Sequence, residues 1–99
     1  MGAMKLNELR DISHTIAKEK GFWDEGRSFA EVCMLIVTEI SEAVEKDREG
    51  NYEGMREELA DTFIRLGDLC GFINMDIEKE VERKTSINKD RPYKHGKRY

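Results

Sequence analysis

The sequence predicts an all-α fold, a four-helix bundle completed by homo-oligomerisation, and three observations support this prediction. Apolar residues recur at helical spacing in four segments that are separated by turn signals. Apolar and charged residues each make up 38% of the 99 residues, with one proline, which is typical of a helical protein with a charged surface. One of the four predicted helices is apolar on nearly every side. The length corresponds to a single domain, residues 1–99.

The first two helices are predicted from apolar spacing and from end signals. Residues 5–20 form an amphipathic helix that stops at Gly21. The second helix runs from about residue 29 to about residue 48, because Ser28 and Glu31 form a capping box ahead of it. Since this helix is apolar nearly all round, it requires burial from several directions, and we expect it to lie at a homodimer or tetramer interface.

The third and fourth helices follow a turn at Gly50 and a short connector. The third spans about residues 52–73, and Gly67 and Gly71 inside it indicate either a close approach of another helix or a kink. The fourth spans residues 77–88, with Asp76 as its N-cap. The chain then ends in a basic, aromatic tail, residues 92–99. We interpret residues 1–4 as a cloning remnant.

The charge of the chain is unevenly distributed. The net charge is −4, but residues 89–99 carry +4, so the other 88 residues carry −8. An acidic body makes nucleic-acid binding unlikely for this protein and is compatible with a metal-binding body and a phosphate-binding tail. There is no apolar run of membrane-spanning length and no secretory signal, so we expect a cytoplasmic protein. Cys33 and Cys70 fall in apolar patterns and are expected to be small buried side chains.

Four carboxylates form two pairs on either side of the Gly50 turn. Glu39 and Glu42 precede it, and Glu58 and Asp61 follow it, each pair at i, i+3 spacing on one side of a helix. In an antiparallel helix hairpin the two pairs lie level with each other. Such a group repels itself unless it is protonated or bridged by a cation, and its hard oxygen ligands favour Mg²⁺, with Mn²⁺ as an alternative.

Glu39 is the most informative of these residues, because it falls inside the apolar stripe of the second helix. A carboxylate there is costly unless it is paired with a cation. A metal ion and a partner Lys or Arg are both possible pairings. Asp68, two turns beyond Asp61, is interpreted as a solvated residue or one that supports the metal ligands.

Cationic and amide side chains continue the inner face of the fourth helix. Lys84 and Asn88 follow Ile77 and Val81 on that face, which suggests that the lysine faces an anion. The alternative is a lysine whose aliphatic part covers apolar surface at a helix end. Arg91 precedes Pro92 and marks the end of the helix.

These residues together resemble the MazG-type nucleoside triphosphate pyrophosphohydrolases, the all-α NTP pyrophosphatase superfamily. The similarity covers residues 22–98 and rests on Glu39-x-x-Glu42, on Glu58-x-x-Asp61, and on a run of motif residues near the C-terminus. That run is Lys84, Asn88 and Arg91-Pro-Tyr-x-His-Gly-Lys. One departure is Thr38, where many members carry a further Glu that is associated with an additional metal or with activation of the water. The metal count and the general base are therefore left open.

The resemblance implies a metal-dependent hydrolase. It implies that Glu39, Glu42, Glu58 and Asp61 are metal ligands and catalytic residues, and that Mg²⁺-dependent cleavage of (d)NTPs occurs between the α and β phosphates. It also implies that Lys84, Asn88 and Arg91 contact phosphates, in some cases across a subunit interface.

The sequence leaves open the role of Trp23, the substrate and the class of protein. Trp23, in the connector after the first helix, is either an aromatic plug or a platform that binds the nucleobase. The same scaffold could act on dUTP or phosphoribosyl-ATP. In a different class, the chain would be a non-catalytic, cation-binding helical interaction module whose basic tail docks on RNA or on an acidic partner.

Overall fold

The computed structural model describes residues 2–96, with side chains placed as far as residue 94. Within that range helices are the only regular secondary structure, and there is no strand. The elements are α1 (Leu6–Glu19), α2 (Phe29–Arg48), α3 (Tyr52–Phe72), α4 (Ile77–Lys89) and a short 3₁₀ helix, η1 (Tyr93–Gly96). The all-α prediction is confirmed, and each helix end lies within one residue of its predicted position. The last part of the predicted basic tail, residues 97–99, lies outside the described residues.

Side-chain caps explain where three of the helices begin. The Ser28 hydroxyl accepts a hydrogen bond from the Glu31 amide at 3.1 Å, and the Asp76 carboxylate accepts one from the Lys79 amide at 3.1 Å. Asn51 caps α3 by accepting from the Gly54 amide at 2.8 Å. These bonds satisfy amides that have no partner inside the helix.

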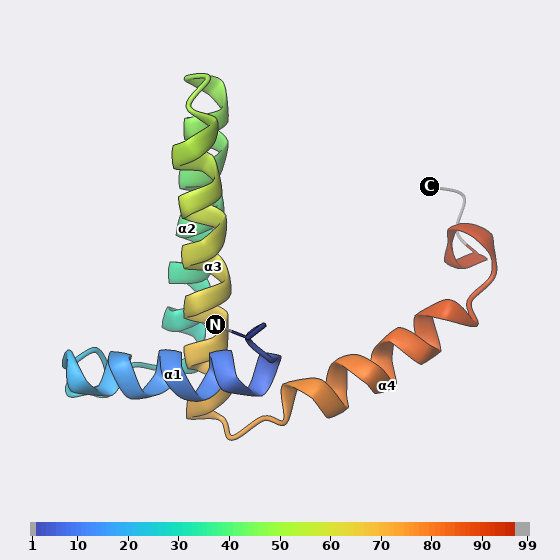
Figure 1. Cartoon of the computed structure of the whole chain (residues 1–99), viewed down its shortest axis with the longest axis horizontal. Coiled ribbons are helices and arrows are strands. Elements are labelled where there is room, and N and C mark those ends of the chain that lie inside the picture. The colour runs from blue at the N-terminus through green and yellow to red at the C-terminus, as the bar shows by residue number, and fades with distance from the viewer. Residues whose placement is uncertain (1, 97–99) are drawn as a thin grey trace.

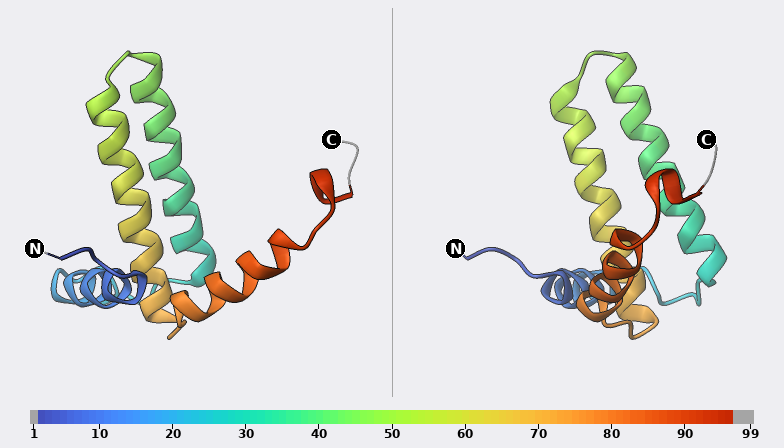
Figure 2. Two further views of the ribbon diagram at one scale, coloured as in Figure 1. Left: turned by 45° about the vertical axis from the view of Figure 1, so that its right-hand side comes forward. Right: turned by 90° about the vertical axis from the view of Figure 1, so that its right-hand side faces the viewer.

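Helices α2 and α3 form a long antiparallel hairpin, and α1 lies across its open end (Figures 1 and 2). The crossing is close because α3 carries glycines where α1 passes. A Cβ added at Gly67 would lie 3.1 Å from Leu9 Cγ, and one added at Gly71 would lie 2.5 Å from His14 Cβ. The structure therefore confirms the close helix approach expected at these two glycines.

Helix α4 leaves the hairpin and extends away from it (Figure 2). Its start is tied to α1 by Asn7, whose amide nitrogen donates to Asp76 Oδ1 at 3.0 Å and whose amide oxygen accepts from the Ile77 amide at 2.8 Å. Beyond Ile77, α4 makes few contacts with the other helices. Ile77 is buried, as predicted for the inner face of α4. The prediction that Val81 is buried on the same face is wrong, because the helix points away from the hairpin and Val81 is 44% exposed.

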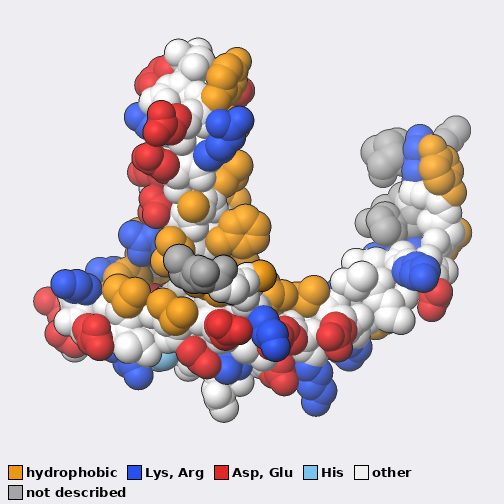
Figure 3. All heavy atoms as spheres, viewed as in Figure 1, with side chains coloured by type: hydrophobic (Ala, Val, Ile, Leu, Met, Phe, Trp, Pro, Cys, Tyr) orange, Lys and Arg blue, Asp and Glu red, His pale blue; other side chains and the backbone are white. Residues whose placement is uncertain are grey.

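A single chain buries little apolar surface. Its radius of gyration is 16.0 Å, against about 13 Å for a compact domain of this length. Its accessible surface is 7813 Å², against about 5,800 Å² for a compact monomer of its mass. Hydrophobic side chains remain exposed along the hairpin and toward the start of α4 (Figure 3). Among the described residues, no helix is both long and apolar enough to cross a membrane.

Part of the exposed apolar surface lines one groove. The groove has a volume of about 510 Å³ and is formed by α1, α2, α3 and the start of α4. Half-buried Cys33 and buried Cys70 both lie on its wall, so the prediction of buried cysteines holds fully only for Cys70. Phe63, in the middle of α3, also lines the groove and is 62% exposed.

Candidate functional site

The two carboxylate pairs come together where α2 and α3 lie side by side. Single oxygen atoms of Glu39, Glu58 and Asp61 all lie within 4.8 Å of one another. Glu42 lies at the edge of this group, close enough to Glu58 to raise the pKa of that carboxyl. The hairpin therefore places all four acidic residues of the sequence pattern in one cluster, which we call the acidic cluster (Glu39, Glu42, Glu58 and Asp61).

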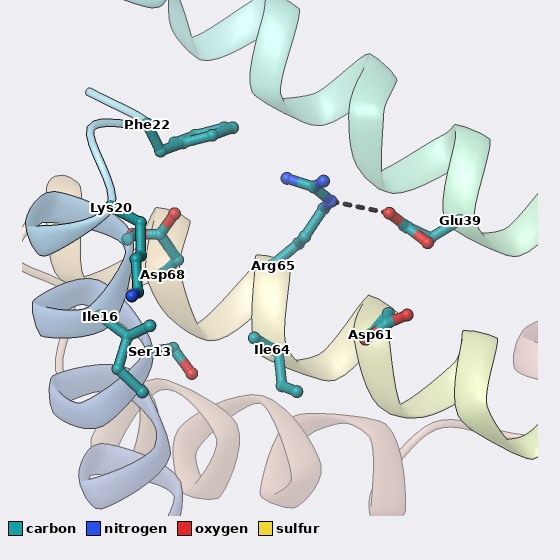
Figure 4. A pocket seen from close by; sticks show the side chains of 10 residues that line it. Ser13, Ile16, Lys20, Phe22, Glu39, Asp61, Ile64, Arg65 and Asp68 are labelled. Carbon is teal, nitrogen blue, oxygen red and sulfur yellow. Dashed lines mark hydrogen bonds and ion pairs between the residues drawn. The ribbon is translucent and has the colours of Figure 1, made fainter. Parts of the chain in front are cut away.

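Arg65, one turn beyond Asp61 on α3, provides a positive charge in the cluster. Its Nε donates to Glu39 Oε1 at 2.8 Å (Figure 4). The Glu39 side chain is 14% exposed and that of Arg65 is 34% exposed, so the pair is partly shielded from water. The sequence allowed Glu39 to pair with a metal ion or with a basic side chain, and the structure contains the basic partner, Arg65.

The crowding of carboxylates shifts their proton affinities in opposite directions. The hydrogen bond from Arg65 is the main reason that the pKa of Glu39 lies below its ordinary value. The pKa of Glu58 is raised to about 7, first by hydrogen bonding with Glu42, then by burial and by Glu39. The cluster thus carries more negative charge than its single arginine neutralises, which is the condition that attracts a divalent cation.

A cavity of about 330 Å³ opens beside the acidic cluster and runs toward α1. Glu39 and Asp61 lie at one end, Arg65 lies in the middle, and Asp68 and Lys20 lie at the other end (Figure 4). The walls between these polar groups are largely apolar and come from α1, from α3 and from the connector after α1. The apolar wall residues are Ile16, Ala17, Phe22 and Ile64.

Asp68 is 5% exposed, so its interpretation as a solvated residue is wrong. Its Oδ1 atom accepts from Trp23 Nε1 at 2.9 Å and lies 2.8 Å from His14 Nδ1. The Trp23 ring stacks on Phe72, with the ring centroids 4.1 Å apart. Trp23 does not line the cavity, whereas its neighbour Phe22 does, and this arrangement favours the interpretation of Trp23 as an aromatic plug.

The three predicted phosphate-contacting residues lie elsewhere on the chain. Lys84 and Asn88 are exposed on α4, and Arg91 is exposed just after it. None of them lines the cavity, because α4 extends away from the hairpin (Figure 1). Within the described part of one chain they do not meet the acidic cluster.

Sequence reasoning gave no functional role to the two basic residues that line the cavity, Lys20 and Arg65. A signal for Arg65 was present, because Glu58, Asp61, Arg65 and Asp68 follow one another at spacings of three, four and three residues. That pattern places all four on one face of α3. No comparable signal marks Lys20, which reaches the cavity only because α1 crosses the hairpin.

The donor set of the acidic cluster fits a hard divalent cation. Three carboxylates each offer one oxygen within 4.8 Å of the others, and carboxylate oxygens are ligands that Mg²⁺ prefers. Comparison with known proteins adds no further guide, since no family model, no curated protein and no solved structure matches the chain.

Proposed function

We propose that the chain is a Mg²⁺-dependent nucleotide pyrophosphohydrolase that cleaves (d)NTPs between the α and β phosphates to give (d)NMP and pyrophosphate. The observation that carries the proposal is the convergence of Glu39, Glu58 and Asp61 at the mouth of a cavity that also contains Arg65 and Lys20. Carboxylates that bind a cation, next to basic side chains, suit a polyphosphate ligand. The resemblance in sequence to the MazG-type enzymes points to the same chemistry.

In the proposed reaction the four carboxylates hold the cation, and the basic residues bind the substrate. Mg²⁺ held there would neutralise phosphate oxygens and lower the pKa of the attacking water. Arg65, which lies beside Glu39, would offset phosphate charge within the cavity. A carboxylate of the cluster that is not fully engaged by the cation would accept the proton from that water.

The proposal includes a homo-oligomer, a dimer or a tetramer. Lys84, Asn88 and Arg91 are solvent-exposed in one chain, and α4 extends far enough from the hairpin for these residues to act on a second copy (Figure 2). In such an assembly they would contact the pyrophosphate leaving group of the partner's site. The apolar groove would be covered at the same time.

The test is a panel of nucleotides with Mg²⁺ or Mn²⁺, in which the products are identified as monophosphate plus pyrophosphate or as diphosphate plus phosphate. Asp61→Asn and Glu42→Gln are each expected to reduce turnover by about 100-fold or more, with helicity unchanged, because each weakens cation binding. Glu45→Gln is the matched control, since Glu45 pairs with Arg48 on the exposed side of α2 and should leave turnover unchanged. Equal turnover in all three variants would contradict the assignment.

One observation favours a second candidate, the non-catalytic interaction module. The Glu39–Arg65 ion pair already relieves part of the repulsion in the acidic cluster without a cation. This alternative predicts that no nucleotide in the panel releases pyrophosphate. It also predicts that binding of RNA or of an acidic partner to the basic tail weakens steeply with salt.

A further inference from the structure

Asp68 is held rigidly in the wall of the cavity. Its side chain is 7% exposed, and Oδ1 is fixed by two ring nitrogens, Trp23 Nε1 at 2.9 Å and His14 Nδ1 at 2.8 Å. Trp23 is itself fixed by stacking on Phe72. Because both holding rings are packed, the carboxylate has little freedom to rotate.

The other carboxylate oxygen of Asp68, Oδ2, has no hydrogen-bond partner among the described residues. No polar side-chain atom among the described residues is fully buried without a partner, so Oδ2 retains some accessible surface, and Asp68 is one of the residues that line the cavity. A carboxylate oxygen that faces a largely apolar cavity is a strong acceptor for any ligand that brings an N–H group there.

The position of Asp68 relative to the acidic cluster fits the length of a nucleotide. Asp61 and Asp68 are two helical turns apart on α3, roughly 10 Å. Between them the cavity is walled by Phe22, Ile16 and Ile64 (Figure 4). A ligand whose phosphates lie at Glu39 and Asp61 would extend its other end, the base, along these apolar walls to Asp68.

We infer that Asp68 is a specificity-determining residue that selects nucleotides whose base carries an amino group, an inference that rests on the proposed function. Cytosine, adenine and guanine each present an exocyclic amine that can donate to Oδ2. Uracil and thymine flank their single ring N–H with two carbonyl oxygens, which the carboxylate repels. A buried acceptor discriminates strongly, because the wrong base leaves it without a partner.

The test uses two ligands that differ only at the ring positions that Asp68 would contact, the α,β-imido analogues of dCTP and dUTP. Their dissociation constants are measured by calorimetry in Mg²⁺, where neither analogue can be cleaved between the α and β phosphates. The wild-type protein is expected to bind the dCTP analogue about tenfold more tightly or better. A wild-type protein that binds both analogues equally, or binds neither, would overturn the inference.

The Asp68→Asn variant is a stricter test than the wild-type comparison, because it is expected to reverse the preference between the two analogues. The Asn oxygen can keep both bonds, to Trp23 and to His14, while its amide nitrogen replaces Oδ2 and presents a donor to the cavity. The preference should therefore reverse toward the dUTP analogue. Glu57→Gln, the same change on an exposed part of α3, should retain the wild-type preference. An Asp68→Asn protein that still prefers the dCTP analogue would refute the assignment.

A second variant covers the case in which Asp68→Asn does not fold. Trp23→Phe retains an aromatic ring but removes the N–H that holds Oδ1, so the preference for the dCTP analogue should shrink without reversing. An unchanged preference in this variant would count against the role of Asp68. Failure of the proposed function is a separate outcome, since it would appear as absence of pyrophosphate release while the binding preference persists.

Discussion

Glu58 links the electrostatics of the acidic cluster to the stability of the fold. The raised pKa, about 7 against an ordinary 4.5, means that the folded state holds this proton more tightly than the unfolded chain does. The stabilisation is complete below pH 4.5 and is lost as the pH rises through about 7. Glu39 has a lowered pKa and acts in the opposite sense, but only at more acidic pH, where its stabilisation is lost as the pH falls.

We therefore predict that, in a chelating buffer, the melting temperature of the protein falls as the pH rises from 4.5 to about 7. Glu58→Gln should flatten this part of the curve, because the amide cannot ionise. Addition of Mg²⁺ should raise the melting temperature most at the upper end of the window, where the carboxylates are charged. A curve that is identical in wild type and Glu58→Gln would show that Glu58 is not the titrating group.

The contact between α1 and α3 depends on how closely the two helices approach each other. Gly71→Ala would place a Cβ 2.5 Å from His14 Cβ, and so α1 must shift. Alanine normally favours a helix over glycine by about 1 kcal/mol. Here we predict a net loss of about 1–3 kcal/mol, because overpacking outweighs that gain. The shift should also disturb the His14–Asp68 pair.

Gly67→Ala is the matched comparison for this prediction. Its added Cβ would meet Leu9 Cγ at 3.1 Å and the Leu9 carbonyl oxygen at 3.4 Å, which are contacts that a small adjustment relieves. The expected change is within about 1 kcal/mol, because the helix propensity gain offsets the tight contact. Urea unfolding of both variants measures the difference. If the Gly71→Ala protein is as stable as the Gly67→Ala protein, α1 does not approach α3 at Gly71 as closely as the structure indicates.

Sequence reasoning succeeded where the signal was local to one element. Helix ends were predictable because caps such as Ser28 and Asp76 act within four residues of the amides that they satisfy. The acidic cluster was predictable because one turn fixes the register of α2 against α3. The path of α4 was not predictable, because it depends on Asn7, which lies 70 residues before Ile77.

The far end of the candidate site was also missed, for the same reason. Asp68 is buried only because α1 and the connector after it bring His14 and Trp23 to it. Neither residue carries a signal in the sequence that points to α3. The spacing of Asp68 from Asp61 did indicate the shared face, and the burial then depended on a crossing that sequence periodicity does not describe.

At the scale of the whole molecule, one chain is too open to bury the apolar residues of its helices. Its accessible surface exceeds that of a compact monomer of the same mass by about a third. The excess includes Met34 and Val37 on α2, which are 61% and 53% exposed, and Phe63 on α3. Apolar patches of this extent are typical of surfaces that are covered by another chain.

We predict that the protein self-associates through the apolar groove, with a sedimentation mass at least twice the 11.5 kDa of one chain. Phe63→Glu should dissociate the assembly, because it places a charge in the groove, while costing one chain little since Phe63 is 62% exposed. Tyr52→Glu is the control, because Tyr52 is 56% exposed at the far end of the hairpin and outside the groove. If both variants sediment like the wild type, the groove is not the interface. If Phe63→Glu yields monomers that also lose pyrophosphohydrolase activity, the site requires residues from a second copy.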